Sequence, residues 1–105
     1  LCGLLFALFL CDNIFMLLVI DIGNTNTNIG IFEGEELIKV YSVASDKIKT
    51  SDEYGIILSS LLINSKVKEK INSAIISSVV PLLGETMQNA IENYFNIVPC
   101  FMPRK

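Results

Sequence analysis

Histidine and tryptophan are both absent from this chain of 105 residues. Without histidine, the commonest general base and a frequent zinc ligand are missing, so any acid–base chemistry must fall to carboxylates. Cysteine is scarce, and Cys2, Cys11 and Cys100 lie far apart without forming a close pair. This odd, scattered set indicates neither a disulfide framework nor a zinc site, and it favours reduced thiols.

Basic residues are also few, because 8 lysines and arginines stand against 11 acidic residues and give a net charge of -3. The lysines gather only at Lys66, Lys68 and Lys70, which we interpret as a solvated turn before a strand. No surface is therefore built to neutralise a nucleic-acid backbone, and we expect no nucleic-acid partner.

Apolar residues are abundant, since 51% of the chain is hydrophobic and only 18% is charged. The length suffices for one small domain with one core. A composition this apolar predicts a mostly buried sheet. It also predicts that the domain is a fragment, separated from the partner surface that would cover part of it. An apolar flank left exposed in this way predicts self-association.

Residues 1–15 are largely apolar and need a separate interpretation. They have neither the basic start nor the small-residue cleavage site of a signal peptide, and Asp12 would sit in the middle of a membrane-spanning helix. We therefore expect no membrane association. Because Met16 directly precedes the first predicted strand, we interpret residues 1–15 as an extension of unclear origin before a natural start.

Three strands are predicted in the first half of the chain. Residues 16–22 have the continuous apolar character of a central strand, whereas residues 27–32 alternate. A turn at residues 33–35, which we interpret as a solvated acidic hairpin tip, leads to a third strand over residues 37–43. Sequential strands with short connections predict an antiparallel meander.

The second half alternates helices and strands. A Thr-x-x-Glu capping box at residues 50–53 predicts a helix over residues 51–63. A strand over residues 71–80, a helix opened by Pro81 and a short strand over residues 96–101 follow. Apolar residues at helical spacing predict a buried stripe on each helix: Tyr54, Ile57, Leu58, Leu61 and Leu62, then Leu83, Met87, Ala90, Ile91 and Tyr94.

The most informative stretch follows the first strand and reads Asp21, Ile22, Gly23, Asn24, Thr25, Asn26, Thr27 and Asn28. A carboxylate at a strand end can orient a magnesium ion, a glycine lets backbone approach closely, and small polar residues donate hydrogen bonds. This chemistry suits the phosphates of a nucleotide and points to phosphoryl transfer. The alternative is a ligand-free hairpin turn, because Asn, Asp and Gly are common in turns.

A second motif, Ser77-Ser78-Val79-Val80-Pro81, closes the fourth strand. With the Asp-x-Gly-Asn-Thr-Asn-Thr motif and the β-β-β-α-β-α-β order, it makes residues 16–101 resemble the N-terminal part of a bacterial type III pantothenate kinase. The resemblance implies an α/β, ribonuclease H-like (actin-like ATPase) fold. Its mixed central sheet would be a three-stranded antiparallel meander followed by α-β-α-β, and ATP would lie between two such domains.

The same resemblance implies a function. Family members transfer the γ-phosphate of ATP to pantothenate in the first step of coenzyme A biosynthesis. They require Mg²⁺ with ATP, are activated by a monovalent cation such as K⁺ or NH₄⁺, and typically work as cytoplasmic homodimers.

Position by position, the resemblance makes residues 21–28 the ATP phosphate-binding segment. Asp21 would lie by the magnesium ion, and Ser77 and Ser78 would lie near the substrate. The alternative for the two serines is a strand end followed by a helix cap.

Two family motifs are not found in this chain. A Gly-x-Asp-Arg motif should carry the catalytic aspartate after the fifth strand, and an Asp-x-Gly-Thr loop in the second domain should help to bind ATP and the monovalent cation. Residues 16–105 are therefore expected to be an N-terminal ATP-binding domain truncated before the second domain. No catalytic residue can be placed, and we predict a fragment that is inactive alone.

Three alternatives stay open. Another kinase or phosphatase of the superfamily, such as a sugar-kinase-like ATPase, would share the phosphate-binding segment. A non-catalytic accessory or regulatory relative would keep the fold without turnover. A small membrane-associated protein would use the apolar N-terminal segment.

Overall fold

The computed structural model describes residues 16–63 and 70–102, which form a five-stranded mixed sheet and two helices. In chain order the elements are β1 (Met16–Ile22), β2 (Asn26–Glu33), β3 (Glu36–Ala44), α2 (Ser51–Ile63), β4 (Ile71–Ser78), α3 (Pro81–Phe95) and β5 (Cys100–Phe101). The predicted order of strands and helices is confirmed. The N-terminal extension (residues 1–15) and the lysines at 66 and 68 lie outside the described residues, so their interpretation stays a prediction.

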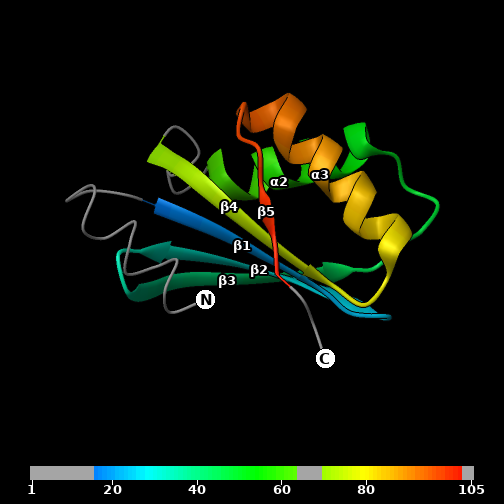
Figure 1. Cartoon of the computed structure of the whole chain (residues 1–105), viewed down its shortest axis with the longest axis horizontal. Coiled ribbons are helices and arrows are strands. Elements are labelled where there is room, and N and C mark those ends of the chain that lie inside the picture. The colour runs from blue at the N-terminus through cyan, green and yellow to red at the C-terminus, as the bar shows by residue number, and fades with distance from the viewer. Residues whose placement is uncertain (1–15, 64–69, 103–105) are drawn as a thin grey trace.

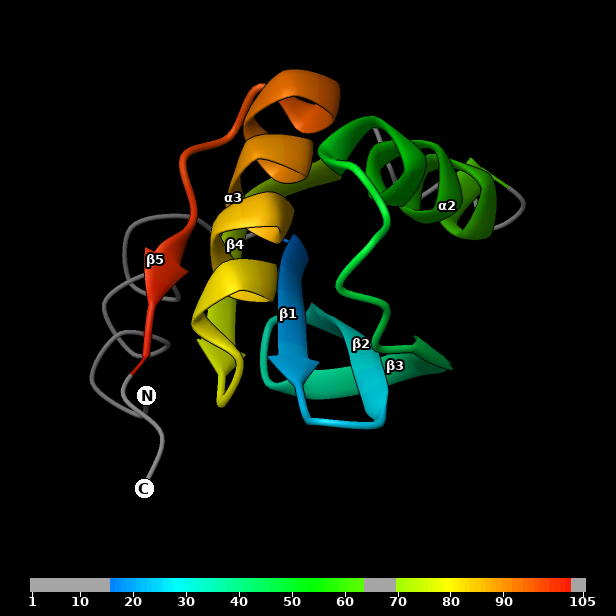
Figure 2. The ribbon, with the colours of Figure 1, turned by 90° about the vertical axis from the view of Figure 1, so that its right-hand side faces the viewer.

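The strands lie in the order β3-β2-β1-β4-β5. β1 and β3 are antiparallel to β2, which confirms the meander, whereas β4 is parallel to both β1 and β5. Both helices lie on one side of the sheet (Figures 1 and 2). Because β1 and β4 are parallel, their last residues meet at one end of the sheet, called here the carboxyl end.

The main core lies between the sheet and the two helices. β1 alternates, and Leu18, Ile20 and Ile22 are fully buried on the helix side. Each such side chain contributes roughly 1.5–3 kcal/mol through burial. The buried members of the two predicted helix stripes are Tyr54, Leu58, Leu62, Leu83, Met87, Ala90 and Ile91. The remaining members, Ile57, Leu61 and Tyr94, are half-buried.

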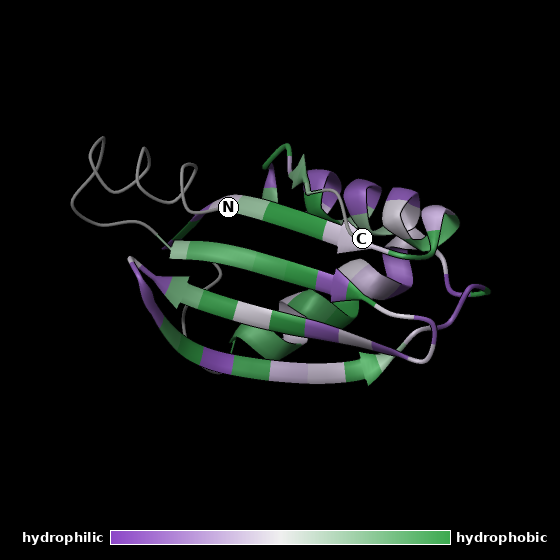
Figure 3. Ribbon diagram, turned by 60° about the horizontal axis from the view of Figure 1, so that its bottom comes forward, coloured by the Kyte–Doolittle hydropathy of each residue, from purple (hydrophilic) through white to green (hydrophobic). Residues whose placement is uncertain are grey.

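No described helix covers the opposite side of the sheet, called here the helix-free face (Figure 3). Leu17 and Ile75 are buried there against Val19, Phe32 and Met102. Farther along the face, Leu37 and Val40 of β3 are 48% and 52% exposed. The face is therefore apolar over β1 and β4 and open to solvent over β3.

Two predicted strand boundaries were wrong. β4 ends at Ser78 rather than at residue 80, because Val80 takes the N-cap position of α3 and Pro81 opens that helix. β5 is confined to Cys100–Phe101, although a strand over residues 96–101 was predicted. Asn96 instead ends α3 in the left-handed conformation with φ 57°, and a proline without an N–H at residue 99 cannot donate to a ladder.

The predicted capping box is confirmed at the start of α2. The Glu53 N–H donates to Thr50 Oγ1 at 3.2 Å, and the Thr50 N–H donates to Glu53 Oε1 at 2.9 Å. Among the residues that the structure describes, neither helix combines the length and apolar character needed to cross a membrane.

Candidate functional site

The Asp21 segment (residues 21–28) forms the hairpin between β1 and β2 at the carboxyl end of the sheet. Its members are distributed as Asp21 and Ile22 in β1, Gly23, Asn24 and Thr25 in the turn, and Asn26, Thr27 and Asn28 in β2. The Gly23 N–H donates to the Asn26 carbonyl oxygen at 3.0 Å and closes the turn. A Cβ at residue 23 would lie 3.0 Å from that same oxygen, so a side chain there would crowd the turn and glycine is favoured.

The turn presents polar groups to solvent. Asn24, Thr25 and Asn26 are exposed, and the backbone N–H groups of Asn24 and Thr25 have no acceptor among the described residues. Successive N–H groups of this kind form concavities that bind anions. The side chains of Ile22 and Thr27 are buried, with exposed fractions of 0% and 1%. These two residues can therefore contact a ligand at the turn only through their backbone.

Asp21 lies in register with Asn28 of β2 on one side and Ser77 of β4 on the other. All three share the helix-free face, because Asp21 alternates with Ile20 and Ile22 of the core. The two sequence motifs, separated by about half the chain, therefore meet at the carboxyl end of the sheet. This position is where ligands bind in open α/β sheets.

Ser78 has a different environment from Ser77. Its Oγ donates to the Val80 carbonyl oxygen at 2.7 Å and accepts from the Val80 N–H at 2.9 Å. The hydroxyl thus fixes the turn between β4 and α3. It does not cap the helix, since Val80 is the N-cap residue and no side chain caps α3. Of the two serines, Ser77 lies beside Asp21.

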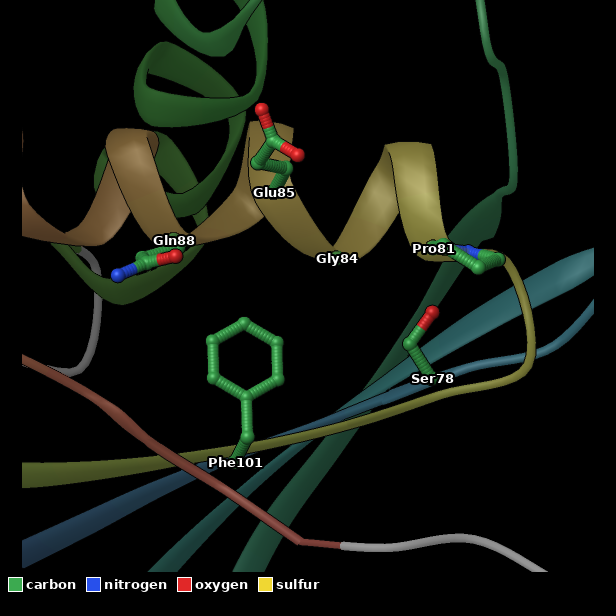
Figure 4. A pocket seen from close by; sticks show the side chains of 6 residues that line it. All are labelled: Ser78, Pro81, Gly84, Glu85, Gln88 and Phe101. Atoms are coloured by element: carbon green, nitrogen blue, oxygen red, sulfur yellow. The ribbon is translucent and has the colours of Figure 1, made fainter.

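A pocket of about 360 Å³ lies between the start of α3 and β5 (Figure 4). It is lined by Ser78, Pro81, Gly84, Glu85, Gln88 and Phe101. Most of these residues escaped the sequence reasoning, although the spacing of residues 81, 84, 85 and 88 marks one face of a helix. Glu85 makes the pocket anionic, and the Gln88 Nε2 group already donates to Glu92 Oε2 at 3.1 Å.

A metal ion at the carboxyl end would rely on the Asp21 carboxylate. No cluster of three or more acidic, cysteine or histidine side chains able to hold a metal occurs within residues 16–63 and 70–102. Mg²⁺ typically uses one or two carboxylates together with substrate phosphates and water, so a single aspartate at the strand end that leads into the exposed turn fits a nucleotide-bound ion. The same arrangement does not fit a closed, all-protein metal site.

Comparison with known proteins supports the resemblance. A sequence model of the type III pantothenate kinase family matches residues 17–105. The type III pantothenate kinase of Finegoldia magna is 46% identical over 91 residues, which are 86% of this chain and 35% of that protein. The enzyme of Pelobacter propionicus is 42% identical over 80% of this chain and 34% of its own length. The enzyme of Myxococcus xanthus is 41% identical over 83% of this chain and 34% of its own length. The chain thus spans about a third of the length of these relatives.

Solved structures show the same fold at low sequence identity. The ROK hexokinase from Thermus thermophilus aligns with a TM-score of 0.62 and 11% identity over 85% of this chain and 35% of its own. The PilM-PilN type IV pilus biogenesis complex aligns with a TM-score of 0.63 and 11% identity over 84% of this chain and 35% of that chain. The fold is therefore that of the actin-like ATPases, related to ribonuclease H, as the sequence predicted. With residues 17–105 matched by the family model, the chain belongs to the type III pantothenate kinase family.

Proposed function

We propose that this chain supplies the ATP phosphate-binding part of a kinase that transfers the γ-phosphate of ATP to pantothenate, the first step of coenzyme A biosynthesis. The observation that carries the proposal is the meeting of Asp21, the exposed turn and Ser77 at the carboxyl end of the sheet. ATP and pantothenate are then the substrates. The complete enzyme is proposed to be a cytoplasmic homodimer.

Each part of the Asp21 segment has a role in this proposal. The Asn24 and Thr25 amides donate to phosphate oxygens, and Gly23 lets the backbone approach them. Asp21 would hold Mg²⁺, which would neutralise part of the phosphate charge when bound with ATP. Ser77, which pairs with Asp21 in the sheet, is assigned to the substrate side of the site. Ser78 supports the site by fixing the turn after β4.

We propose no catalytic base among these residues. No Gly-x-Asp-Arg sequence occurs in the 105 residues, and neither does the second loop that would help to hold K⁺ or NH₄⁺. Phosphoryl transfer depends on positioned cations and donors from both sides of the nucleotide. The 105-residue chain is therefore expected to bind Mg²⁺-ATP weakly and to phosphorylate pantothenate at an undetectable rate.

A chimera tests the proposal. Residues 16–102 replace the matching segment of the Finegoldia magna enzyme, and calorimetry with Mg²⁺-ATP is combined with a phosphorylation assay on pantothenate. We expect binding and turnover, with Asp21→Asn lowering turnover about 100-fold or more. Glu35→Gln at the opposite hairpin tip is the matched control and should change neither. Loss of activity in Glu35→Gln equal to that in Asp21→Asn would contradict the assigned role.

The same chimera separates the alternative functions. Binding without turnover would favour a non-catalytic accessory relative, and transfer to a sugar but not to pantothenate would favour a sugar-kinase-like ATPase. A chimera that folds and binds no nucleotide would reduce the Asp21 segment to a hairpin turn.

A further inference from the structure

Ser45, the residue after β3, holds the Asp21 segment through two hydrogen bonds. Its backbone N–H donates to the Thr25 carbonyl oxygen at 2.8 Å. Its Oγ is 2.8 Å from Oγ1 of Thr27, whose side chain is 1% exposed. One bond fixes the turn itself and the other fixes the start of β2. Ser45 therefore ties both to the strand that follows them.

Tyr54 of α2 in turn fixes the backbone on both sides of Ser45. Its hydroxyl accepts a hydrogen bond from the Asp46 N–H at 2.8 Å. Its single proton can be donated to the carbonyl oxygen of Ala44 or of Asp46, each 3.2 Å away. Tyr54 is 1% exposed, so this hydroxyl makes its hydrogen bonds away from competing water. A helix on the core side is thereby connected, through Ser45, to the exposed turn.

We propose that Ser45 and Tyr54 are positioning residues that hold the Asn24 and Thr25 amides ready for nucleotide phosphates; this inference rests on the proposed function. Donors that are fixed before the ligand arrives need no reorganisation when it binds. Neither residue needs to touch the nucleotide. Ser45 acts through the turn, and Tyr54 acts through the backbone that presents Ser45.

The variants delete single hydroxyl groups. Ser45→Ala removes the bond to Thr27 and keeps the backbone bond to Thr25, while Ser45→Thr restores a hydroxyl at the same place. Tyr54→Phe keeps the buried ring and removes the bonds that flank Ser45. Two deletions elsewhere are matched controls: Thr86→Ala, whose Oγ1 donates to the Leu82 carbonyl oxygen at 3.1 Å, and Tyr94→Phe, whose hydroxyl donates to Asp52 Oδ1 at 3.1 Å.

Two NMR measurements on the ¹⁵N-labelled 105-residue chain test the positioning role of Ser45 and Tyr54. Without ligand, relaxation order parameters report how rigid the Asn24 and Thr25 amides are. With Mg²⁺-ATP, the shifts of the same amides report the dissociation constant. We expect Ser45→Ala and Tyr54→Phe to lower the order parameters and to weaken binding about 3- to 10-fold, the range of one hydrogen bond. Ser45→Thr should restore both readouts, and the two controls should leave both unchanged.

The outcomes separate this inference from the proposed function. If the unaltered chain binds Mg²⁺-ATP and the Ser45 variants bind equally well, the positioning role is wrong and the proposed function stands. If the unaltered chain shows no response at the turn even at millimolar Mg²⁺-ATP, the two amides are not held ready for phosphates and the positioning role is wrong, while the chimera still decides the proposed function. Should Tyr54→Phe unfold, the Ser45→Ala and Ser45→Thr pair decides alone.

Discussion

Gly55 lies within α2, where the ring of Tyr94 from α3 covers it. A Cβ at residue 55 would overlap that ring. Glycine within a helix costs about 1 kcal/mol relative to alanine, so helix propensity alone would favour replacement. The close approach of the two helices explains why glycine stands there. This contact could not be predicted from the sequence, because the two residues are distant along the chain.

We predict that Gly55→Ala lowers the free energy of unfolding by about 1–3 kcal/mol, because overpacking outweighs the gain in propensity. Gly84→Ala is the comparison, since its Cβ would lie 3.4 Å from the nearest atoms of Phe101 and Ser78, an ordinary contact. That variant should be neutral or up to about 1 kcal/mol more stable. Urea denaturation measures both. Adding Tyr94→Ala should abolish the cost of Gly55→Ala, and a cost that persists would contradict the overlap.

At the scale of elements, α2 and α3 are also joined by a hydrogen bond from the Tyr94 hydroxyl to Asp52 Oδ1 at 3.1 Å. Burial of the phenol and the neighbouring Asp52 carboxylate raise the pKa of Tyr94 above its ordinary value of 10.0. The raised pKa means that the folded state favours the protonated phenol. The stability that the protonated Tyr94 phenol contributes is therefore fully present below pH 10, and it is lost as the pH rises through the folded-state pKa.

We predict that alkaline pH weakens the contact between α2 and α3 through Tyr94. In an ultraviolet titration of tyrosinate formation, a component with a midpoint above 10.0 should disappear in Tyr94→Phe. Replacing the carboxylate by a neutral amide in Asp52→Asn should lower that midpoint, because it takes away the neighbouring negative charge. An unchanged midpoint in Asp52→Asn would show that burial alone sets the pKa.

Local interactions decided which elements were predictable. The start of α2 followed from the reciprocal bonds of Thr50 and Glu53, which lie three residues apart, and the meander followed from alternation and short turns. The strand predicted over residues 71–80 is too long because Val80 and Pro81 already belong to the start of α3, and the strand predicted over residues 96–101 begins too early because Asn96 still ends that helix. For the candidate site, the Asp21 segment was readable as a motif. Ser45 was not, because its partners are 18 and 20 residues away.

For the molecule as a whole, the helix-free face is the feature that governs association. Leu37 lies over Gly30, with its Cδ1 3.4 Å from where a Cβ would be, and Val40 is half-exposed beside them. In the described part of the chain, nothing covers these residues. A contiguous apolar surface of this kind favours contacts between copies.

We predict concentration-dependent self-association of the 105-residue chain in sedimentation velocity. The double variant Leu37→Glu/Val40→Lys keeps the net charge and should shift the distribution toward monomer. Ile56→Glu/Ile63→Lys makes the same change on the outer side of α2, where the residues are 57% and 67% exposed, and should leave association unaltered. A monomeric unaltered chain would refute the role of the face.

The parallel pairing of β1 with β4 also has a consequence for biosynthesis. On the ribosome, β1, β2, β3 and α2 emerge well before β4, yet β1 is the strand that β4 flanks. Until residues 71–78 leave the exit tunnel, one side of the most apolar strand has no hydrogen-bonding neighbour. Non-local pairing of this kind is slow, and an unpaired apolar strand invites aggregation while it waits. The time between the emergence of β1 and that of β4 therefore sets how long the nascent chain is vulnerable.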